Sequence, residues 1–494
     1  MKKIAIVGGG IAGLAAGVYA QNCGFDTTIY ESHTMPGGAC TSWKRKGYIF
    51  EGAMHWLTGS SPKSSYHQLW RDVGAINDQV QFHSVDPFLT VECEGQIVCL
   101  YRNLARWQQH LISIAPEDDK EIKRLCSDLS DFSKFSMPIK DLKGLKLRKP
   151  IVFEKFNLLK FVALLPAIIR IGYYAKISSK DYARRFKNPA IRLLLRSITG
   201  DEYAATATVF TLATLMNGDG AFPDGGSLAM AARMAAKYQS LGGVIEYKHK
   251  VAKIVVKEGR AVGLEVNDRQ VDADAVIITQ DAAVATQDLF EKPLSDRWVL
   301  QMRNTLVPKS CTFLCVGTKA DLCNEPKSGV FIAGTPLKLG DCQFNIINYH
   351  LYSAESGYAP GKGTAITSII GGDSYDFWKN RELAGTYKQT KEQLAQDFIA
   401  VLTQHFPHLK GQIEVWDVAT PLTYERYIHS YKGSWMGIST VGSKMGMYPC
   451  KVRSIENVYF AGQRISPPGG LPSAVNTART AVQHLCRDFD VAFG

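Results

Sequence analysis

The chain has 494 residues, a hydrophobic share of 46% and a formal net charge of +11 at pH 7. This length exceeds what one hydrophobic core usually supports, so two or more domains are expected in a globular protein. The eleven cysteines are scattered without a Cys-x-x-Cys pair, which predicts a reducing cytoplasm, mostly buried thiols and no metal site.

A short apolar segment near the N-terminus leads into a glycine-rich turn. Residues 4–7 read Ile-Ala-Ile-Val, which is typical of a parallel strand covered on both faces. The glycines that follow, Gly8, Gly10 and Gly13, have the Gly-x-Gly-x-x-Gly spacing of a dinucleotide-binding turn. Gly8 permits the tight turn, Gly10 lets a pyrophosphate approach the backbone, and Gly13 lets the next helix pack near the strand. The segment therefore predicts a strand, a phosphate-binding turn and a helix.

A second predicted strand, at residues 25–31, ends in an acidic side chain. Glu31 lies 18 residues after Gly13. A carboxylate that binds ribose hydroxyls is expected roughly 20 residues after this glycine. The same charge would repel a 2′-phosphate. Strand, turn, helix, strand and acid in this order predict a bound dinucleotide.

The next segments contain glycine-rich loops, short strands and then helices. The Gly37-Gly38 pair lies in a predicted glycine-rich loop at residues 35–43. Residues 80–102 alternate apolar and polar side chains, which is the pattern of antiparallel strands. Residues 104–200 are predicted to be mostly helical.

Most of the excess positive charge lies in residues 140–196. Within this window, residues 158–174 are interrupted by Lys160, Pro166 and Arg170, so they fall short of the roughly 20 apolar residues that a spanning helix needs. An apolar helix with basic flanks suits an anionic bilayer surface, which predicts a peripheral protein on the inner face of the membrane. A core helix with a solvated basic face is the alternative. A nucleic-acid partner is not expected, because no nucleic-acid motif accompanies the charge.

The second half of the chain returns to alternating strands and helices. A predicted helix at residues 228–241 precedes four predicted strands, at residues 243–250, 251–257, 261–266 and 271–279. The last of them could rejoin the first sheet. Residues 300–445 alternate strands and helices. A strand at 458–463 and a glycine-rich turn then lead into a last helix at 474–489.

Four of these motifs together resemble the phytoene desaturase and retinol saturase branch of the flavin amine oxidase superfamily. They are residues 8–31, the Gly37-Gly38 loop, residues 222–226 with the following helix and the strand at Val251, and residues 461–472. The resemblance covers nearly the whole chain and is diffuse between residues 100 and 200. It implies FAD as the cofactor, held by Gly8, Gly10, Ala12, Gly13, Glu31, Gly37, Gly38, Val251, Gly462, Gly470, Leu471 and Pro472.

The resemblance also implies an architecture. It is an α/β fold in which a Rossmann-like FAD-binding domain is combined with a discontinuous α+β substrate domain, as in flavin amine oxidases. The FAD-binding domain is expected to comprise residues 1–85, 218–296 and 452–494. The substrate domain, which would also face the membrane, is expected to comprise residues 86–217 and 297–451.

The closing glycine-rich turn has a physical interpretation of its own. Gly469, Gly470 and Pro472 free a helix N-terminus that can face the pyrimidine edge of a flavin. The reduced flavin carries negative charge at this edge, and the helix dipole stabilises it.

Two further segments bear on the reaction. Residues 52–59 are similar to the Gly-x-His segment of the retinol saturases and lack the Gly-Pro pair that phytoene desaturases have there. This departure favours saturase-like or isomerase-like chemistry over polyene desaturation. Residues 419–427 look like the family's Thr-Pro segment beside the substrate cavity.

The predicted function is that of an FAD-dependent oxidoreductase that saturates, desaturates or isomerises C=C or C–C bonds of a hydrophobic isoprenoid or other lipid by flavin hydride transfer. Two alternatives stay open: an FAD amine oxidase, and a flavin-bound isomerase or membrane scaffold whose flavin is not turned over. Because no second nucleotide-binding motif is evident, the electron partner could be oxygen, a quinone or NAD(P)H.

Three side chains are candidates for the chemistry. His55 is the acid–base candidate because the unperturbed pKa of histidine lies near neutrality, and a hydrogen-bonded structural histidine is the alternative. Arg464 could face the flavin or a substrate carboxylate, or make a phosphate or structural contact. Tyr424 could line the substrate cavity or fill a core.

Overall fold

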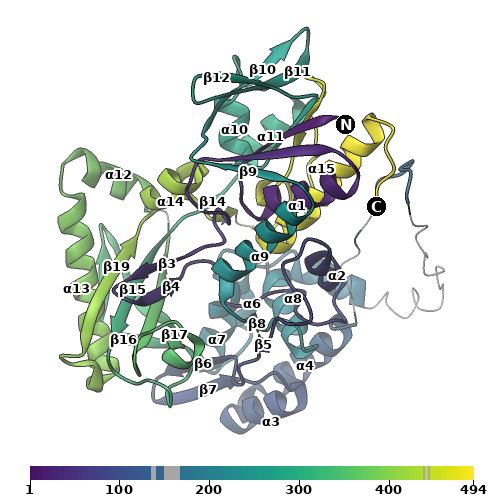
Figure 1. The fold of residues 1–494 in the computed structure, drawn as a ribbon. Helices are drawn as coiled ribbons and strands as arrows, with labels where there is room; N and C mark the ends of the chain where they lie inside the picture. Colours follow the sequence, from purple (N-terminus) through teal and green to yellow (C-terminus); the bar gives the residue numbers. More distant parts are fainter. Residues whose placement is uncertain (135–138, 140, 149–166, 373, 438–439, 443–445) are drawn as a thin grey trace.

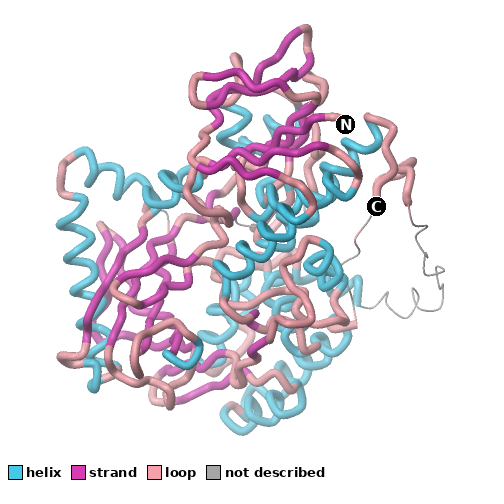
Figure 2. Tube along the Cα trace, in the orientation of Figure 1, coloured by secondary structure: helices cyan, strands magenta, loops and turns pink. Residues whose placement is uncertain are grey.

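The computed structural model describes residues 1–134, 139, 141–148, 167–372, 374–437, 440–442 and 446–494. Within them, a parallel sheet with its helices forms the upper part of Figure 1, a long and mostly antiparallel sheet the lower left, and a group of helices the lower right. Figure 2 shows the same division, with the strands in magenta and the helices in cyan. Residues 149–166, which include half of the predicted membrane-surface helix, lie outside the described residues.

The parallel sheet is assembled from strands that are far apart in the sequence. Its order is β21-β13-β1-β2-β9, and Ile6 of β1 lies between Ile29 of β2 and Ile277 of β13. Every neighbouring pair is parallel, and residues 4–7 are buried. The prediction that the strand near residue 275 rejoins the first sheet is confirmed. The strands are β1 (Lys3–Val7), β2 (Asp26–Glu31), β9 (Val244–Tyr247), β13 (Ala275–Ile278) and β21 (Val458–Phe460).

Three helices form the core that packs with this sheet. The first of them is buried from Ile11 to Ala20, as expected of a helix that is apolar on all sides. It contacts both of the others, and a Cβ on Gly17 would lie 2.6 Å from the ring of Tyr238. The helices are α1 (Ile11–Asn22), α9 (Gly226–Ser240) and α15 (Leu471–Asp488).

A three-stranded antiparallel sheet extends this part of the molecule. Its strands confirm the predicted segments 251–257 and 261–266, whereas the predicted segment 271–279 divides into two strands that belong to different sheets. The three strands are β10 (Val251–Lys257), β11 (Arg260–Val266) and β12 (Arg269–Asp272).

The second large sheet has seven strands in the order β19-β15-β18-β17-β16-β6-β7. Two of them, β6 and β7, form the antiparallel pair predicted within residues 80–102. Helix α13 packs against the other part of this sheet. The elements are β6 (Leu89–Cys93), β7 (Gln96–Leu100), β15 (Cys311–Thr318), β16 (Ser328–Leu339), β17 (Cys342–Ser353), β18 (Thr364–Gly371), β19 (Ile413–Ala419), α12 (Tyr375–Leu383) and α13 (Tyr387–His405).

Helices dominate the described residues between 104 and 216, as predicted. Asn188 caps the helix that follows it, accepting hydrogen bonds from the backbone N–H groups of Ala190 and Ile191, and Pro189 fits the first turn. These helices share one hydrophobic core with β6 and β7. They are α3 (Leu104–Ile114), α4 (Asp119–Phe132), α6 (Ser179–Ala183), α7 (Pro189–Thr199) and α8 (Ala205–Met216).

Shorter elements connect these layers. All eleven cysteines lie among the described residues as free thiols, and most of them are buried, as predicted. The connecting elements are β3 (Ser42–Arg45), β4 (Tyr48–Glu51), α2 (Ser65–Asp72), β5 (Phe82–His83), η1 (Pro116–Asp118), β8 (Phe222–Pro223), α10 (Ala282–Asp288), α11 (Arg297–Thr305), β14 (Pro308–Lys309), η2 (Ala354–Ser356), η3 (Pro407–Leu409), α14 (Pro421–Ile428), η4 (Tyr431–Gly433), β20 (Met436–Gly437) and η5 (Gln463–Ile465).

The packing of α11 differs from the predicted division of the chain. This helix falls in the segment that we expected in the substrate domain, but Trp298, Val299 and Met302 are buried in the core of the parallel sheet. The Trp298 ring packs edge-on against Phe460 of β21, with 5.5 Å between centroids. An amphipathic pattern predicts a buried face without saying which core will cover it.

Close packing between helix α1 and the first turn depends on Gly13. A Cβ at this position would lie 1.9 Å from the backbone oxygen of Gly8 and 3.1 Å from Oγ1 of Thr279. Thr279 Oγ1 itself donates to the backbone oxygen of Val7 at 2.8 Å, so it cannot move away without losing this hydrogen bond. Only a residue without a side chain fits between the helix and the strand end.

Substituting Gly13 with alanine should therefore lower the free energy of unfolding by about 1–3 kcal/mol or more, measured by denaturant titration. Gly172 provides the control, because it is also helical and exposed, and a Cβ there would have no neighbour within 4 Å. Gly172→Ala should be neutral or slightly stabilising, since alanine favours helix. Equal stability of the two variants would contradict this account of Gly13.

Candidate functional site

One cavity of about 1590 Å³ runs along the carboxyl ends of β1, β2 and β13. Ligands of α/β proteins bind at this edge of a parallel sheet. The cavity then continues between the helices of the second domain, where Phe132, Ile198 and Phe210 line it. It is therefore shared by the two parts of the molecule.

The predicted cofactor residues converge on this cavity. All of them except Gly13 line its wall. Gly13 instead packs against the Gly8 carbonyl, which is the packing role predicted for it. The residues in the wall are Gly8, Gly10, Ala12, Glu31, Gly37, Gly38, Val251, Gly462, Gly470, Leu471 and Pro472.

Two of the predicted glycine motifs lie directly against each other. The backbone N–H of Gly37 donates to the oxygen of Gly9 at 2.9 Å, and Gly10 and Gly37 form an isolated parallel bridge. A Cβ on Gly38 would lie 3.1 Å from the Cα of Gly10. The second loop thus closes over the first turn, and glycines allow the approach.

The N-terminus of α1 is suited to an anion. Its N-cap, Gly10, offers no side chain, and its first turn contains no acidic residue. The first helical N–H that donates to a backbone acceptor is that of Leu14, to Gly10 at 2.9 Å. The preceding residues Ile11 and Ala12 line the cavity, so their N–H groups and the helix dipole are available to phosphate oxygens.

Glu31 stands beside this turn at the end of β2. The side chain is buried, and its Oε2 accepts a hydrogen bond from the N–H of Gly9 at 2.6 Å. Its Oε1 accepts from the N–H of His33 at 2.7 Å. A carboxylate has further lone pairs after these two bonds, so it can also accept from ribose hydroxyls in the cavity.

A second helix begins at the opposite side of the cavity. We predicted a helix from residue 474, whereas α15 begins at Leu471, because Pro472 is compatible with a first helical turn. The residues before it, Gly469 and Gly470, have φ values of 112° and 88°, and Gly470 caps the helix without a side chain. The first turn contains no acid, so this positive helix end can stabilise negative charge.

Together these groups fit FAD. The α1 terminus with the Gly37-Gly38 loop would hold the pyrophosphate, and Glu31 would hold a ribose. Val251, buried at the start of β10, lines the same end of the cavity, and the α15 terminus would face the flavin. A cradle of glycines, two helix ends without acids and one carboxylate is the donor and acceptor set that a flavin dinucleotide requires.

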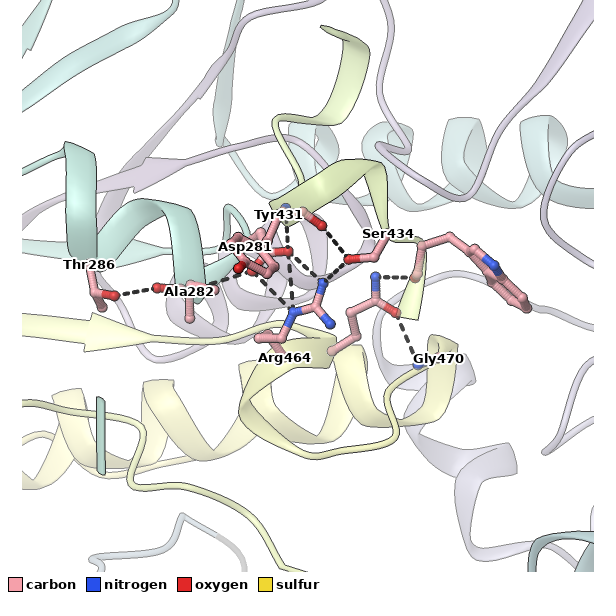
Figure 3. A network of polar contacts seen from close by, with 10 residues as sticks. Asp281, Ala282, Thr286, Tyr431, Ser434, Arg464 and Gly470 are labelled. Atoms are coloured by element: carbon pink, nitrogen blue, oxygen red, sulfur yellow. Dashed lines mark hydrogen bonds and ion pairs between the residues drawn. The ribbon is translucent and has the colours of Figure 1, made fainter. Parts of the chain in front are cut away.

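Arg464 lies in the cavity wall, but its guanidinium is engaged with protein groups. Its side chain is 4% exposed, and Nη2 lies 2.6 Å from Oδ2 of Asp281, which is 6% exposed. Nη2 also donates to Oγ of Ser434 at 2.8 Å (Figure 3). The sequence left four contacts open for Arg464: flavin, a substrate carboxylate, a phosphate or a structural contact. This geometry matches the structural contact.

His55 lines the cavity and stacks on a second histidine. The rings of His55 and His350 are 4.0 Å apart and 15° from parallel, and the hydroxyl of Tyr352 lies 3.4 Å from Nδ1 of His55. Burial lowers the pKa of His55 to about 4. Burial therefore favours the neutral imidazole, which has one ring nitrogen free to accept a proton, over the imidazolium.

Tyr424 also lines the cavity, from helix α14. Its ring packs against Phe313 with 6.1 Å between centroids, in a cluster that includes Cys311 and Cys315. Burial, and then the charges of these two thiols, raise the pKa of Tyr424. The hydroxyl has no hydrogen-bond partner among the described residues. The side chain combines the two predicted placements, because it borders both cavity and core.

Glu51 holds segments beside the cavity together, and sequence reasoning missed it. It is fully buried and accepts hydrogen bonds from the N–H groups of Met54 and Ser227, both at 3.1 Å, and from the hydroxyl of Tyr358 at 3.2 Å. Burial raises the pKa of Glu51 although these donors oppose the shift. It therefore fixes the loop that carries His55 to the start of α9. Its one sequence signal is an acid that ends an apolar strand.

Lys309 was also missed. It lines the cavity from β14, with Nζ 4.6 Å from the ring centre of Tyr203 and 3.4 Å from the backbone oxygen of Thr199. Burial lowers the pKa of Lys309. Nothing in the local sequence separates it from the many exposed lysines.

Curated relatives span nearly the whole chain. All-trans-retinol 13,14-reductase of Danio rerio is 23% identical, covering 93% of this chain and 82% of the relative. Prolycopene isomerase of Daucus carota is 24% identical, covering 94% and 77%. A lycopene-forming phytoene desaturase of a Paracoccus species is 23% identical, covering 99% and 98%.

Solved structures share the fold. An oxidoreductase from Methanosarcina mazei superposes with a TM-score of 0.58 at 17% identity, covering 97% of this chain and 100% of that chain. Putrescine oxidase gives a TM-score of 0.61 at 14% identity, covering 98% and 99%. Cyclohexylamine oxidase from Brevibacterium oxydans gives 0.58 at 13% identity, covering 99% of each.

A family model agrees with the geometry of the cavity. The model of the flavin containing amine oxidoreductases matches residues 11–486, and the cradle described above fits the FAD that this family uses. The chain therefore belongs to the flavin containing amine oxidoreductase family and is an FAD-dependent oxidoreductase.

Proposed function

We propose that the protein saturates, desaturates or isomerises C=C or C–C bonds of a hydrophobic isoprenoid or other lipid by flavin hydride transfer. The observation that carries this proposal is the single cavity that joins the cofactor cleft to the helical part of the second domain. The names of the relatives support it, since they refer to reduction of retinol, isomerisation of prolycopene and desaturation of phytoene.

The size of the cavity leaves room for a substrate beside the cofactor. Its volume of about 1590 Å³ exceeds the roughly 300–1,000 Å³ of a pocket for one drug-sized ligand. The part that lies among the helices would accommodate the substrate.

Helix α8 contributes an apolar strip to the wall of this inner part. On α8, Thr206, Phe210 and Thr214 share one face because they are four residues apart, and all three line the cavity. The hydroxyl of Thr214 donates to the backbone oxygen of Phe210 at 2.8 Å, so its methyl group is left for the cavity. Phe210 stacks on Phe132 with 5.7 Å between centroids. Such a wall suits a hydrocarbon chain and keeps water out.

The chemistry divides between cofactor and protein. FAD supplies hydride transfer when bound, so few side chains need to react. His55, neutral and held between His350 and Tyr352, is placed to accept a proton from a substrate carbon. The Glu51 network keeps the loop of His55 in place.

We further propose that the helical face near residues 168–173 contacts an anionic bilayer. Ile169 is 73% exposed and Ile168 is 41% exposed, and basic residues surround them in the sequence. The same helix is joined to α4, because Arg170 forms ion pairs with Asp128 and Asp131. The end of α4 borders the cavity, so this face lies beside a route from a membrane to the active site. No helix in the described part of the chain is long and apolar enough to cross a bilayer.

The function can be tested through the flavin under anaerobic conditions, with retinol, phytoene and prolycopene offered beside a panel of amines. Desaturation would bleach the oxidised flavin, saturation would reoxidise flavin that has been chemically reduced, and isomerisation would change the product without a net flavin change. Bleaching by amines with no change to any lipid would contradict the proposal.

Gly10→Val is the matched control for this assay. A Cβ on Gly10 would come no nearer than 3.7 Å to any protein atom, so the variant should fold while its side chain occupies the pyrophosphate cradle. It should purify colourless and inactive with an unchanged circular dichroism spectrum. A yellow, active Gly10→Val protein would show that the cofactor lies elsewhere.

The lowered pKa of His55 predicts a specific pH dependence. The pKa of His55 is about 4 in the folded protein against 6.5 when unperturbed, so below pH 6.5 the unfolded chain binds a proton that the folded protein does not. Stability should therefore fall between pH 6.5 and pH 4, by on the order of 2–3 kcal/mol for this group. His55→Phe keeps a ring stacked on His350. It should remove this part of the loss of stability at low pH, and it should slow turnover while FAD stays bound. Full activity would assign His55 a structural role only.

The membrane contact can be tested by co-sedimentation with anionic and zwitterionic liposomes. The double variant Ile168→Glu/Ile169→Glu should lose most binding to anionic vesicles, because it removes apolar contact and adds repulsive charge. Leu383→Glu is the control, since Leu383 is 78% exposed on α12. If the double variant and the control bind alike, this face is not the membrane contact.

A further inference from the structure

A buried ion pair joins two loops that leave adjacent strands of the parallel sheet. Asp281 follows β13 and caps α10, and Arg464 follows β21 in η5. Nε of Arg464 donates to Oδ1 at 3.1 Å, while Nη2 donates to Oδ2 at 2.6 Å. Both side chains are almost fully buried. Such a pair is costly to desolvate unless its remaining bonding capacity is used.

The ion pair makes further hydrogen bonds to a segment from the other part of the molecule, residues 431–437. The N–H of Tyr431 donates to Oδ2 of Asp281 at 3.1 Å, and Nη2 of Arg464 donates to Oγ of Ser434. Figure 3 shows Asp281 and Arg464 side by side, with Tyr431 and Ser434 above them. The ion pair therefore binds the 431–437 segment through one backbone N–H, that of Tyr431, and one side chain, that of Ser434.

Gln463 makes a second connection between the 431–437 segment and the other part of the molecule. Its Nε2 donates to the backbone oxygen of Trp435 at 2.5 Å, and its Oε1 accepts from the N–H of Gly470 at 3.2 Å. In addition, the N–H of Gly437 donates to the oxygen of Pro468 at 2.9 Å. The 431–437 segment is thereby tied to the turn that begins α15, which is the helix end that faces the flavin.

The segment held in this way is itself cavity wall. Trp435 and Met436 line the cavity, as do Pro468 and Gly470 across from them. The polar groups thus join a part of the wall contributed by the substrate domain to the flavin-facing turn of the other domain. FAD, when bound, would contact the turn, and a substrate would contact the wall.

We propose that Asp281, Ser434, Gln463 and Arg464, here called the clasp, are positioning residues that hold the 431–437 segment in register with the flavin-facing turn, so that FAD binding orders this wall. Arg464 acts through Asp281 and Ser434 rather than on the reacting atoms. The idea that this wall meets the substrate rests on the proposed function, whereas its coupling to FAD does not.

The test measures how fast trypsin cleaves after Lys432, which lies inside the segment, in FAD-loaded and FAD-depleted protein. In the wild type, FAD should protect the site. Arg464→Met should abolish this protection and raise the cleavage rate of the FAD-loaded protein at least about tenfold, because breaking one side of a buried pair opens the segment. It should also shift the visible spectrum and the reduction potential of the bound flavin. Arg464→Lys should partly restore both the protection by FAD and the wild-type flavin signals.

Arg479→Met provides the matched control. Arg479 forms an ion pair with Asp141 in which both side chains are 15% exposed, and neither residue lines the cavity. This variant should lower the melting temperature without changing cleavage at Lys432 or the flavin signals. If Arg464→Met does not fold, Ser434→Ala replaces it, because it removes the bond from Nη2 of Arg464 and the bond from the Ser434 hydroxyl to the backbone oxygen of Tyr431, and it leaves the ion pair.

Equal behaviour of the clasp and control variants, with lower melting temperatures but unchanged cleavage and flavin spectra, would overturn the proposal. Cleavage at Lys432 that does not respond to FAD in the wild type would also overturn it. None of these measurements needs a substrate. A failure of the lipid assay would therefore count against the proposed function and leave the clasp unaffected.

Discussion

The contact of Gly13 with the backbone of Gly8 is the constraint on which the site depends. Because no Cβ intervenes, the first turn of α1 lies directly over the end of β1 and its N–H groups reach the cavity. A wider separation would move the positive helix end away from the phosphates, and the dipole effect is confined to the first turn. The glycine pair at 37–38 then closes over this turn by the same means.

The parallel sheet turns this local geometry into a site. Its strands come from three distant stretches of chain, and their carboxyl ends meet at one edge. The edge therefore collects Glu31, the Asp281 loop and the turn before α15 around one cavity. The second domain adds the helical wall and the 431–437 segment. Cofactor and substrate sites are thus continuous because the chain crosses between domains several times.

Burial then determines how the polar groups behave. His55 and His350 stay neutral because their surroundings disfavour charge, and His350 is further affected by its neighbour. Asp281 and Arg464 form an ion pair in the same wall, and Ser434 and a backbone N–H make further hydrogen bonds to it. Burial therefore favours the uncharged form of the two histidines, whereas the ion pair holds two loops together.

The sequence by itself determined the parts of the site whose geometry is local. The spacing of Gly8, Gly10 and Gly13, the acid at Glu31 and the turn before α15 each follow from what a few consecutive residues can do, and all were predictable. Only the tertiary structure decided which side chains meet. His350 lies far along the chain from His55, and Arg464 is neutralised by Asp281 from another strand. The packing of α11 was undecidable for the same reason: local pattern predicts that a face is buried, but the partner that covers it depends on how distant segments pack.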